Sequence, residues 1–321
     1  MIKDKIKNPL KLNSFRELGI FLAFVIVLVS LMILSPTAFA RPANLINILK
    51  QASINGILAF GMTFVIVSGG IDLSVGSIVA LSGVIAASFA HPGEYRLIVP
   101  ISLALMAGLI SGILNGIGVA FGNIPPFIVT LGSMTIIRGL ALIASKGQPV
   151  FNVTKAFEHL AGGFILNFIP HLVITFVSVT AICAFVLTRT VFGRRVYAVG
   201  GNETTAKVSG INVNRIKISV YSISGFLAGL AGLLLASRII SGNPTSGQAY
   251  ELDAIAAVII GGVSMSGGSG KWYGTVIGAL FIAVIGNGLD ILNVSSNFQL
   301  VIKGSIIIIA VLLDMKGKGT Q

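Results

Sequence analysis

The chain has 321 residues, of which 55% are hydrophobic and only 10% are charged, and its mean hydropathy is +0.97. Soluble domains carry about 25% charged residues, so this composition excludes an ordinary water-soluble protein. The net charge of +12 does not point to a nucleic-acid partner, because the Lys and Arg residues lie between apolar runs, where they orient membrane proteins.

Stretches without charged residues or histidine give the predicted membrane spans, because a helix needs about 20 mainly apolar residues to cross a bilayer. The stretch 97–137 would be about 60 Å long as one helix, and Pro125 and Pro126 divide it into two spans. The sequence thus predicts an all-α polytopic membrane protein with about ten transmembrane helices. In chain order the stretches are 18–40, 51–71, 73–90, 97–137, 172–188, 218–237, 254–270, 272–289 and 291–313, the last interrupted by Lys303.

The distribution of basic residues predicts the orientation. With a cytoplasmic N-terminus, most of the 22 Lys and Arg residues fall in cytoplasmic segments, as the positive-inside rule requires. We therefore expect cytoplasmic tails at 1–17 and 314–321 around a transmembrane domain at 18–313. The first apolar stretch could alternatively belong to a signal peptide cleaved after Ala40, but it exceeds the usual 7 to 15 apolar residues, which favours its retention as a span.

The residues outside the predicted spans leave little room for chemistry. The two long connections, 146–171 outside and 189–217 inside, are too short for a catalytic or ATP-binding domain, and the chain lacks a GxxxxGK[ST] phosphate loop. The glycine-rich segment 267–270 resembles a nucleophile motif, but no histidine follows it. We therefore expect no catalytic residue and no cofactor. We also expect no metal site, since the histidines and the cysteine lack metal-ligand spacing; they are His91, His159, His171 and Cys183.

A polar segment, Ser68 to Ser77, interrupts the second and third predicted spans. Irregular backbone at membrane depth is tolerated only where protein or a water-filled cavity satisfies its polar groups, so we expect a buried junction here. Asp72 either caps the next helix through backbone N–H groups or lines a pathway together with Ser74.

Arg138 lies in the middle of the fifth predicted span, where an unpaired cation costs about 2.5–3.5 kcal/mol. A carboxylate such as Asp72, backbone carbonyls or water must compensate it. Thr130 and Met134 share its helix face, because the three residues recur every four positions. This face either makes a structural interhelical bond or lines a pathway.

Three GxxxG units on two of the predicted spans predict close helix packing. Gly108, Gly112 and Gly116 lie on the fourth span and Gly225 and Gly229 on the seventh. Glycines let helix backbones approach closely, and dense packing within one subunit is favoured over a dimer seam.

The inside connection 189–217 contains a predicted short helix. Asn202 is a candidate N-cap, Glu203 supplies an acidic first turn, and Gly210 is a stop signal. Such a short helix needs something to pack against. It either lies on anionic lipid or docks a cytoplasmic protein.

Several long motifs resemble one known family, the membrane permeases of bacterial ATP-binding-cassette importers for monosaccharides, and the ribose permeases most of all. The match runs from about residue 43 to 315. Its most specific segments are GMTFVIVSGGIDLSVGS at 61–77, GGNETTAKVSGINV at 200–213, YELDAIAA at 250–257 and GGVSMSGGSG at 261–270.

The resemblance implies a homodimeric sugar permease in the bacterial inner membrane, working by alternating access. A cytoplasmic ATPase and an extracytoplasmic sugar-binding protein are its implied partners, besides membrane lipid. The short cytoplasmic helix then couples the ATPase to the permease, through Asn202, Glu203, Thr204, Thr205, Ala206, Lys207, Val208, Ser209 and Gly210. The fifth span becomes a pathway helix, with Asp72, Ser74, Thr130, Met134 and Arg138 as the pathway or gating residues.

Two alternatives remain open. Another monosaccharide or an autoinducer-2-like furanose could be the cargo, because the binding protein selects it in such systems. An ion-coupled symporter would instead use buried carboxylates as relays, and Asp72 is the one acidic residue expected at depth.

Overall fold

The computed structural model describes residues 22, 24–122, 124–166 and 168–316. The expected N-terminal tail, the start of the first predicted span and the last residues of the expected C-terminal tail lie outside the described residues. In the part described, the regular secondary structure is helical apart from one short antiparallel hairpin of β1 (Phe164–Ile165) and β2 (Ile169–Pro170).

The helices follow the predicted apolar stretches in order. A helix at Phe24–Leu34 comes first. It is followed by α2 (Pro36–Phe39), α3 (Pro42–Val67), α4 (Val75–Ser88), α5 (Ile98–Phe121), α6 (Pro126–Ala144) and α7 (Lys155–Gly162). After the hairpin come α8 (His171–Arg189), α9 (Val191–Gly201), α10 (Glu203–Val208), α11 (Val213–Ile239), α12 (Tyr250–Ile260), α13 (Trp272–Ile291) and α14 (Ser296–Lys316).

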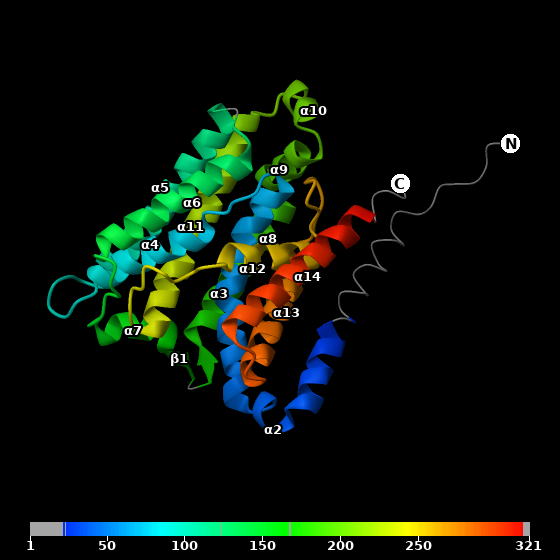
Figure 1. Cartoon of the computed structure of the whole chain (residues 1–321). Coiled ribbons are helices and arrows are strands. Elements are labelled where there is room, and N and C mark those ends of the chain that lie inside the picture. Colours follow the sequence, from blue (N-terminus) through cyan, green and yellow to red (C-terminus); the bar gives the residue numbers. More distant parts are fainter. Residues whose placement is uncertain (1–21, 23, 123, 167, 317–321) are drawn as a thin grey trace.

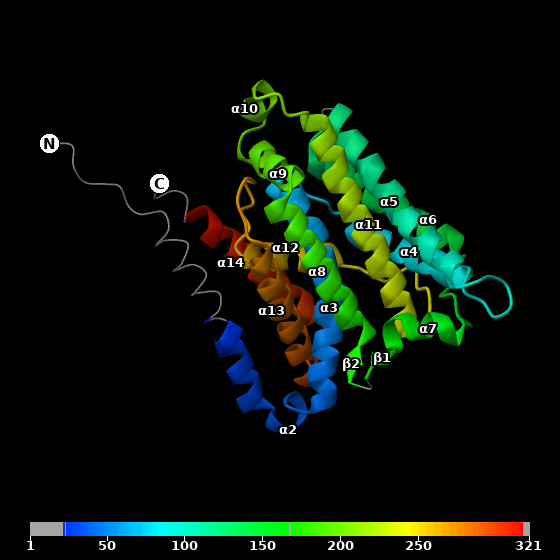
Figure 2. The same ribbon diagram turned by 180° about the vertical axis from the view of Figure 1, so that it is seen from behind.

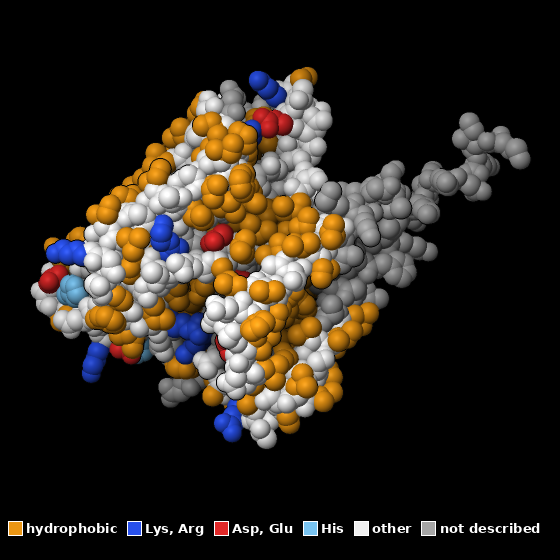
Figure 3. Space-filling view, viewed as in Figure 1, with side chains coloured by type: hydrophobic (Ala, Val, Ile, Leu, Met, Phe, Trp, Pro, Cys, Tyr) orange, Lys and Arg blue, Asp and Glu red, His pale blue; other side chains and the backbone are white. Residues whose placement is uncertain are grey.

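Six of the described helices, α3, α5, α6, α8, α11 and α13, are long and apolar enough to cross a membrane. Three further apolar helices are shorter, at Phe24–Leu34, Val75–Ser88 and Ser296–Ile309. The structure therefore confirms an all-α polytopic membrane protein, while the count of about ten spans stays a prediction. Apolar side chains cover much of the surface seen in Figure 3, as lipid contact requires.

The two long connections lie at opposite ends of the molecule. In Figures 1 and 2, α9 and α10 of the predicted inside connection lie at one end, and α7 and the hairpin of the predicted outside connection lie at the other. The inside connection 189–217 is itself mostly helical, because α9, α10 and the first turn of α11 occupy it.

The α5 and α11 helices pack through their glycines, as predicted. A Cβ on Gly108 would lie 2.7 Å from the Cα of Gly229, and a Cβ on Gly112 would lie 3.0 Å from the Cα of Gly225. Larger side chains at these positions would separate the helices, so the GxxxG patterns form a seam inside this chain.

Two predicted boundaries are wrong. The second span was expected to start at residue 51, but α3 starts at Pro42 and includes Lys50, whose ammonium group lies 4.7 Å from the centre of the Phe164 ring. The stretch 254–270 was expected to be one span, but α12 ends at Ile260. The next residues form a loop in which Gly262, Gly267 and Gly268 adopt positive φ angles, which a helix does not allow.

Candidate functional site

The buried junction between α3 and α4 is organised around the Asp72 carboxylate, which is fully buried. Its Oδ1 accepts hydrogen bonds from the Ser74 backbone N–H at 3.0 Å and the Ser74 hydroxyl at 2.6 Å. Its Oδ2 accepts one from the Ser224 hydroxyl of α11 at 2.8 Å, and Asn115 of α5 donates to the Ser74 hydroxyl oxygen at 2.8 Å. Asp72 therefore stabilises the turn before α4 and joins three helices; we call Asp72, Ser74, Asn115 and Ser224 the Asp72 network.

Side chains of α11 and α6 also satisfy a backbone carbonyl group of this junction. The carbonyl oxygen of Ile71 accepts a hydrogen bond from the Tyr221 hydroxyl of α11 at 3.0 Å. Thr130 of α6 approaches the same oxygen at 3.4 Å and donates to Pro126 in its own helix at 2.8 Å. The predicted buried junction thus exists, with protein groups in the place of water.

Arg138 is compensated by backbone carbonyls. Its Nη1 donates to the carbonyl oxygens of Pro244 at 2.7 Å and Ser246 at 2.8 Å. The oxygens of Asp72 are occupied by Ser74 and Ser224, so the structure does not pair the two charges.

The Arg138 carbonyl acceptors belong to an irregular segment, 240–249, between α11 and α12. Ile240 and Ala249 adopt left-handed conformations at its two ends, and Gly242 forms a backbone bridge with Val150. Of the predicted pathway face on α6, Thr130 is buried, and Met134 and Arg138 are half-buried. This face is therefore turned toward the junction and the irregular segment.

A second charge inside the predicted spans has a partner that the sequence reading missed. The ammonium group of Lys303 in α14 lies 2.8 Å from Oδ2 of Asp253 in the first turn of α12. Asp253 is buried. The available signal was a cation within one apolar stretch and a carboxylate directly before another. Sequence spacing alone does not show that two residues 50 positions apart form a pair.

The short helix α10 has the predicted capping. The Asn202 side chain accepts a hydrogen bond from the Thr205 backbone N–H at 2.8 Å, and Gly210 follows the helix with a φ of 82°. Glu203 forms an ion pair with Lys217 of α11 at 2.8 Å. Among the residues from Asn202 to Gly210 only Ala206 is buried, so α10 presents nearly all of its surface, including Val208 with 84% exposed.

A glycine joint lies beneath α9 and connects it to the junction. The Val67 carbonyl at the end of α3 accepts a hydrogen bond from the Gly268 N–H at 2.9 Å. A Cβ on Gly200 would collide with that same carbonyl and lie 2.7 Å from the Gly268 nitrogen. A Cβ on Gly267 would lie 3.0 Å from the Gly69 Cα. These four glycines, Gly69, Gly200, Gly267 and Gly268, form what we call the glycine joint.

Tyr197 fixes the same loop from the side. Its hydroxyl in α9 donates to the Gly270 carbonyl at 2.9 Å. Burial raises the pKa of Tyr197, which keeps this donor protonated. Segments from three parts of the chain, the end of α3, α9 and the α12–α13 loop, therefore meet through backbone contacts next to α10.

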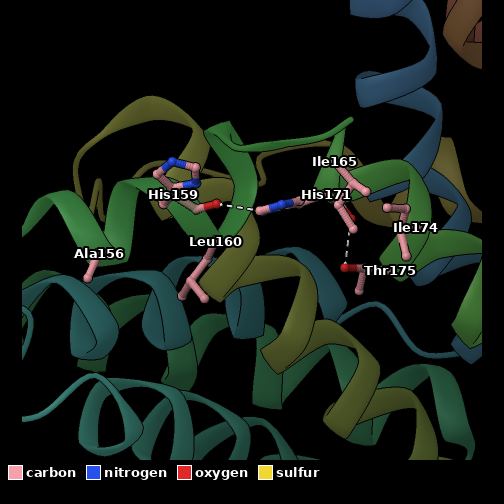
Figure 4. A pocket seen from close by; sticks show the side chains of 7 residues that line it. All are labelled: Ala156, His159, Leu160, Ile165, His171, Ile174 and Thr175. Carbon is pink, nitrogen blue, oxygen red and sulfur yellow. Dashed lines mark hydrogen bonds between the residues drawn. The ribbon is translucent and has the colours of Figure 1, made fainter. Parts of the chain in front are cut away.

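At the opposite end of the molecule, two of the three histidines lie together. The His159 and His171 rings are 5.7 Å apart, and Nδ1 of His171 lies 2.9 Å from the His159 carbonyl oxygen. They line a cavity of about 400 Å³ between α7, the hairpin and the start of α8 (Figure 4). The described residues contain no group of three or more His, Cys, Asp or Glu side chains that could hold a metal ion.

Comparisons with known proteins place most of the chain in one family. Residues 44–311 match the family model for the permease component of a branched-chain amino acid transport system. A ribose import permease protein of Bacillus subtilis is 47% identical over 94% of this chain and 93% of its own length.

Other relatives show how the identity varies within this family. The ribose import permease proteins of Haemophilus influenzae and Escherichia coli K12 are each 43% identical over at least 92% of both chains. The xylose transport system permease protein of Haemophilus influenzae is 34% identical over 92% of this chain and 95% of its own length. No solved structure matches the chain. The chain therefore belongs to this family of transport-system permease components, and it is a transporter subunit and not an enzyme.

Proposed function

We propose that this chain is the membrane permease subunit of an ATP-binding-cassette importer that moves ribose across the bacterial cytoplasmic membrane. The observation that carries the proposal is the identity of 43–47% with ribose import permeases over nearly the full length of both chains. The identity with the xylose permease is lower, at 34%, which favours ribose over xylose.

The proposed assembly contains two copies of this chain, a cytoplasmic ATPase and an extracytoplasmic ribose-binding protein. Each copy crosses the membrane about ten times, with both termini in the cytoplasm. The exposed helix α10 docks on the ATPase through the residues from Asn202 to Gly210. Its exposure and its position at the end of the molecule that carries the basic connection support this assignment.

The proposed mechanism is alternating access without covalent chemistry. Movement of α10 on ATP-driven closure of the ATPase is passed through α9 and the glycine joint to the α3–α4 junction. Asp72, Ser74, Thr130, Met134 and Arg138 act at this junction and on α6, where they hold the irregular backbone beside the pathway. Packed interfaces of this kind switch between discrete arrangements rather than deform continuously.

The test of the substrate is uptake by proteoliposomes that contain this chain with the ATPase and binding protein encoded beside it. Ribose, allose, xylose, arabinose, galactose and an autoinducer-2-like furanose are supplied in turn with internal ATP. We expect ribose uptake to exceed that of every other sugar. Preferred uptake of another member of the panel would replace ribose as the substrate and leave the importer proposal standing.

A further inference from the structure

An apolar groove of about 320 Å³ runs along the outside of the helix bundle, between α8 and α11. Figure 2 shows these two helices side by side on the near face of the molecule. The one hydroxyl side chain that lines the groove belongs to Ser222. This hydroxyl donates a hydrogen bond to the Ile218 carbonyl oxygen at 2.8 Å, so it presents little polarity to the groove. The lining residues are Phe64, Leu109, Val179, Ile182, Cys183, Val186, Ser222, Ile223, Phe226, Leu227 and Leu230.

The groove opens toward the surroundings of the protein at the depth of the bilayer. Both α8 and α11 are long and apolar enough to span a membrane. Ile182 on one wall is 62% exposed and Phe226 on the other is 38% exposed. A surface of this kind, without backbone polar groups to satisfy, suits a hydrocarbon chain.

Arginine side chains lie beyond one end of the groove. Arg189 follows Ile182 by seven residues on α8, and Arg215 precedes Ser222 by seven residues on α11. Seven residues are about two helical turns, or about 10 Å, so each arginine lies on the same helix face as the groove residue and beyond it toward the α9 end. Arg189 and Arg215 are both exposed.

The helix α9 begins directly at this end and adds two more cations. Arg194 and Arg195 are exposed, whereas Gly193, Val196 and Val199 of the same helix are buried. Within the described chain, no carboxylate lies within ion-pair distance of Arg189, Arg194, Arg195 or Arg215. The apolar groove therefore leads toward a concentrated positive charge at the α9 end of α8 and α11.

We propose that this groove binds one acyl chain of an anionic phospholipid and that Arg189 and Arg215 hold its phosphate group. Charge complementarity selects the lipid. Each cation near the membrane surface raises the affinity for an anionic headgroup about fivefold, whereas a zwitterionic headgroup carries no net charge. A second copy of the chain fits less well, because a symmetric contact across the groove would gather the four arginines of both copies at the same end of the interface. The site is independent of the transported cargo.

Quenching by brominated lipids tests the site in bilayers. The chain has a single tryptophan, Trp272, so Trp272→Phe gives a background for one reporter, Ile182→Trp in the groove. Val177→Trp is the matched control, because Val177 is 58% exposed on α8 but five residues from Ile182 and so on a different side of the helix. Dibrominated phosphatidylglycerol and phosphatidylcholine are titrated against each reporter.

We expect Ile182→Trp to report a preference of about fivefold or more for phosphatidylglycerol, and the control to report little. Arg189→Gln with Arg215→Gln should reduce the preference at Ile182→Trp to the control value. Equal preferences at the two reporters, or a preference unchanged in the double variant, would overturn the proposal. Absence of quenching at Ile182→Trp alone would also overturn it, since protein would then cover the groove.

Native mass spectrometry provides a second measurement on the protein with its natural residues. The full chain, solubilised with bacterial lipid, should retain phosphatidylglycerol or cardiolipin. Arg189→Gln with Arg215→Gln should lose it, while Arg41→Gln, at the opposite end of the molecule, should not. Equal retention by all three proteins would contradict the site whatever the tryptophan variants show.

Discussion

Buried polar residues in this protein hold irregular backbone within an apolar bundle. Asp72 has three donors for its two oxygens, and Arg138 binds two carbonyl oxygens of the segment 240–249. A buried charge without partners costs several kcal/mol, whereas one that is fully hydrogen-bonded can be tolerated. Both residues therefore allow the helices to be interrupted at membrane depth.

We predict that Asp72 and Arg138 act separately. Exchanging them, as Asp72→Arg with Arg138→Asp, should not restore function lost in either single variant, because the structure gives the two charges different partners. Asp72→Ala leaves three donors without an acceptor, at about 1–3 kcal/mol for each buried group left unsatisfied, and should lower the yield of folded protein. Asp72→Asn keeps one acceptor oxygen and should fold better than Asp72→Ala. Recovery of sugar uptake in the exchanged variant would show that the charges pair during transport.

The ion pair between Asp253 and Lys303 supports a prediction about stability. Removing one partner of a buried pair costs about 3–5 kcal/mol, so Asp253→Asn and Lys303→Met should each lower the thermal unfolding midpoint in detergent. The combined variant should recover part of this loss, because no uncompensated charge remains. If the decrease in midpoint of the combined variant equals the sum of the two single decreases, the two residues are not coupled.

At the scale of the elements, the α10 helix lies next to a joint made of backbone alone. No side chain fits in this joint, because Gly200 packs directly against the Val67 carbonyl and the Gly268 backbone. Close packing transmits displacement because a dense interior is hard to compress. The joint can therefore carry a movement of α9 and α10 to the end of α3.

We predict that Gly200→Ala uncouples transport from ATP hydrolysis. The added methyl group overlaps the Val67 carbonyl, and overpacking costs about 1–3 kcal/mol, which should separate α9 from α3. Sugar uptake should fall by about tenfold, the equivalent of 1.4 kcal/mol, with the ATPase still bound. The matched control is Gly201→Ala, because a Cβ on Gly201 meets no atom within 4 Å. Equal uptake by the two variants would count against the joint.

The sequence allowed most of the helices to be located, for a physical reason. Each helix must bury or expose to lipid a long apolar surface, so charge-free stretches mark it. The start of α3 does not follow from the charge pattern, because the long side chain of Lys50 lies over the Phe164 ring, where a cation is tolerated within a helix. The end of α12 does not follow from the charge pattern either, because the glycines and hydroxyl side chains of the next loop carry no charge.

The candidate site was only half predictable. Asp72, Arg138 and the cap at Asn202 stand out locally, since each is a polar residue in an informative context. The partners of Asp72, Ser74 and Arg138 come from distant segments, and one sequence contains no signal that brings them together. These partners are Ser224, Asn115 and Pro244 respectively. The glycine joint was likewise invisible, because its contacts are between backbones and not between side chains.

At the scale of the whole molecule, the two long connections lie at opposite ends, so we predict that they face opposite sides of the membrane. The connection 189–217 should face the cytoplasm and 146–171 the outside. In a Cys183→Ser background, a cysteine at Val208 should react with a membrane-impermeant maleimide only in inside-out vesicles. A cysteine at Leu166, which is 76% exposed in the hairpin, should react only in right-side-out vesicles. Labelling of both sites from the same side would contradict the proposed topology.

The central claim is that this chain moves a sugar only as part of an ATP-driven assembly. The most direct measurement is ribose uptake into proteoliposomes from which the ATPase, the binding protein or ATP is omitted in turn, with a proton or sodium gradient as the alternative energy source. The account predicts uptake only when all three are present, and none on a gradient alone. Uptake by this chain alone on an ion gradient would contradict it and would make Asp72 a candidate coupling carboxylate.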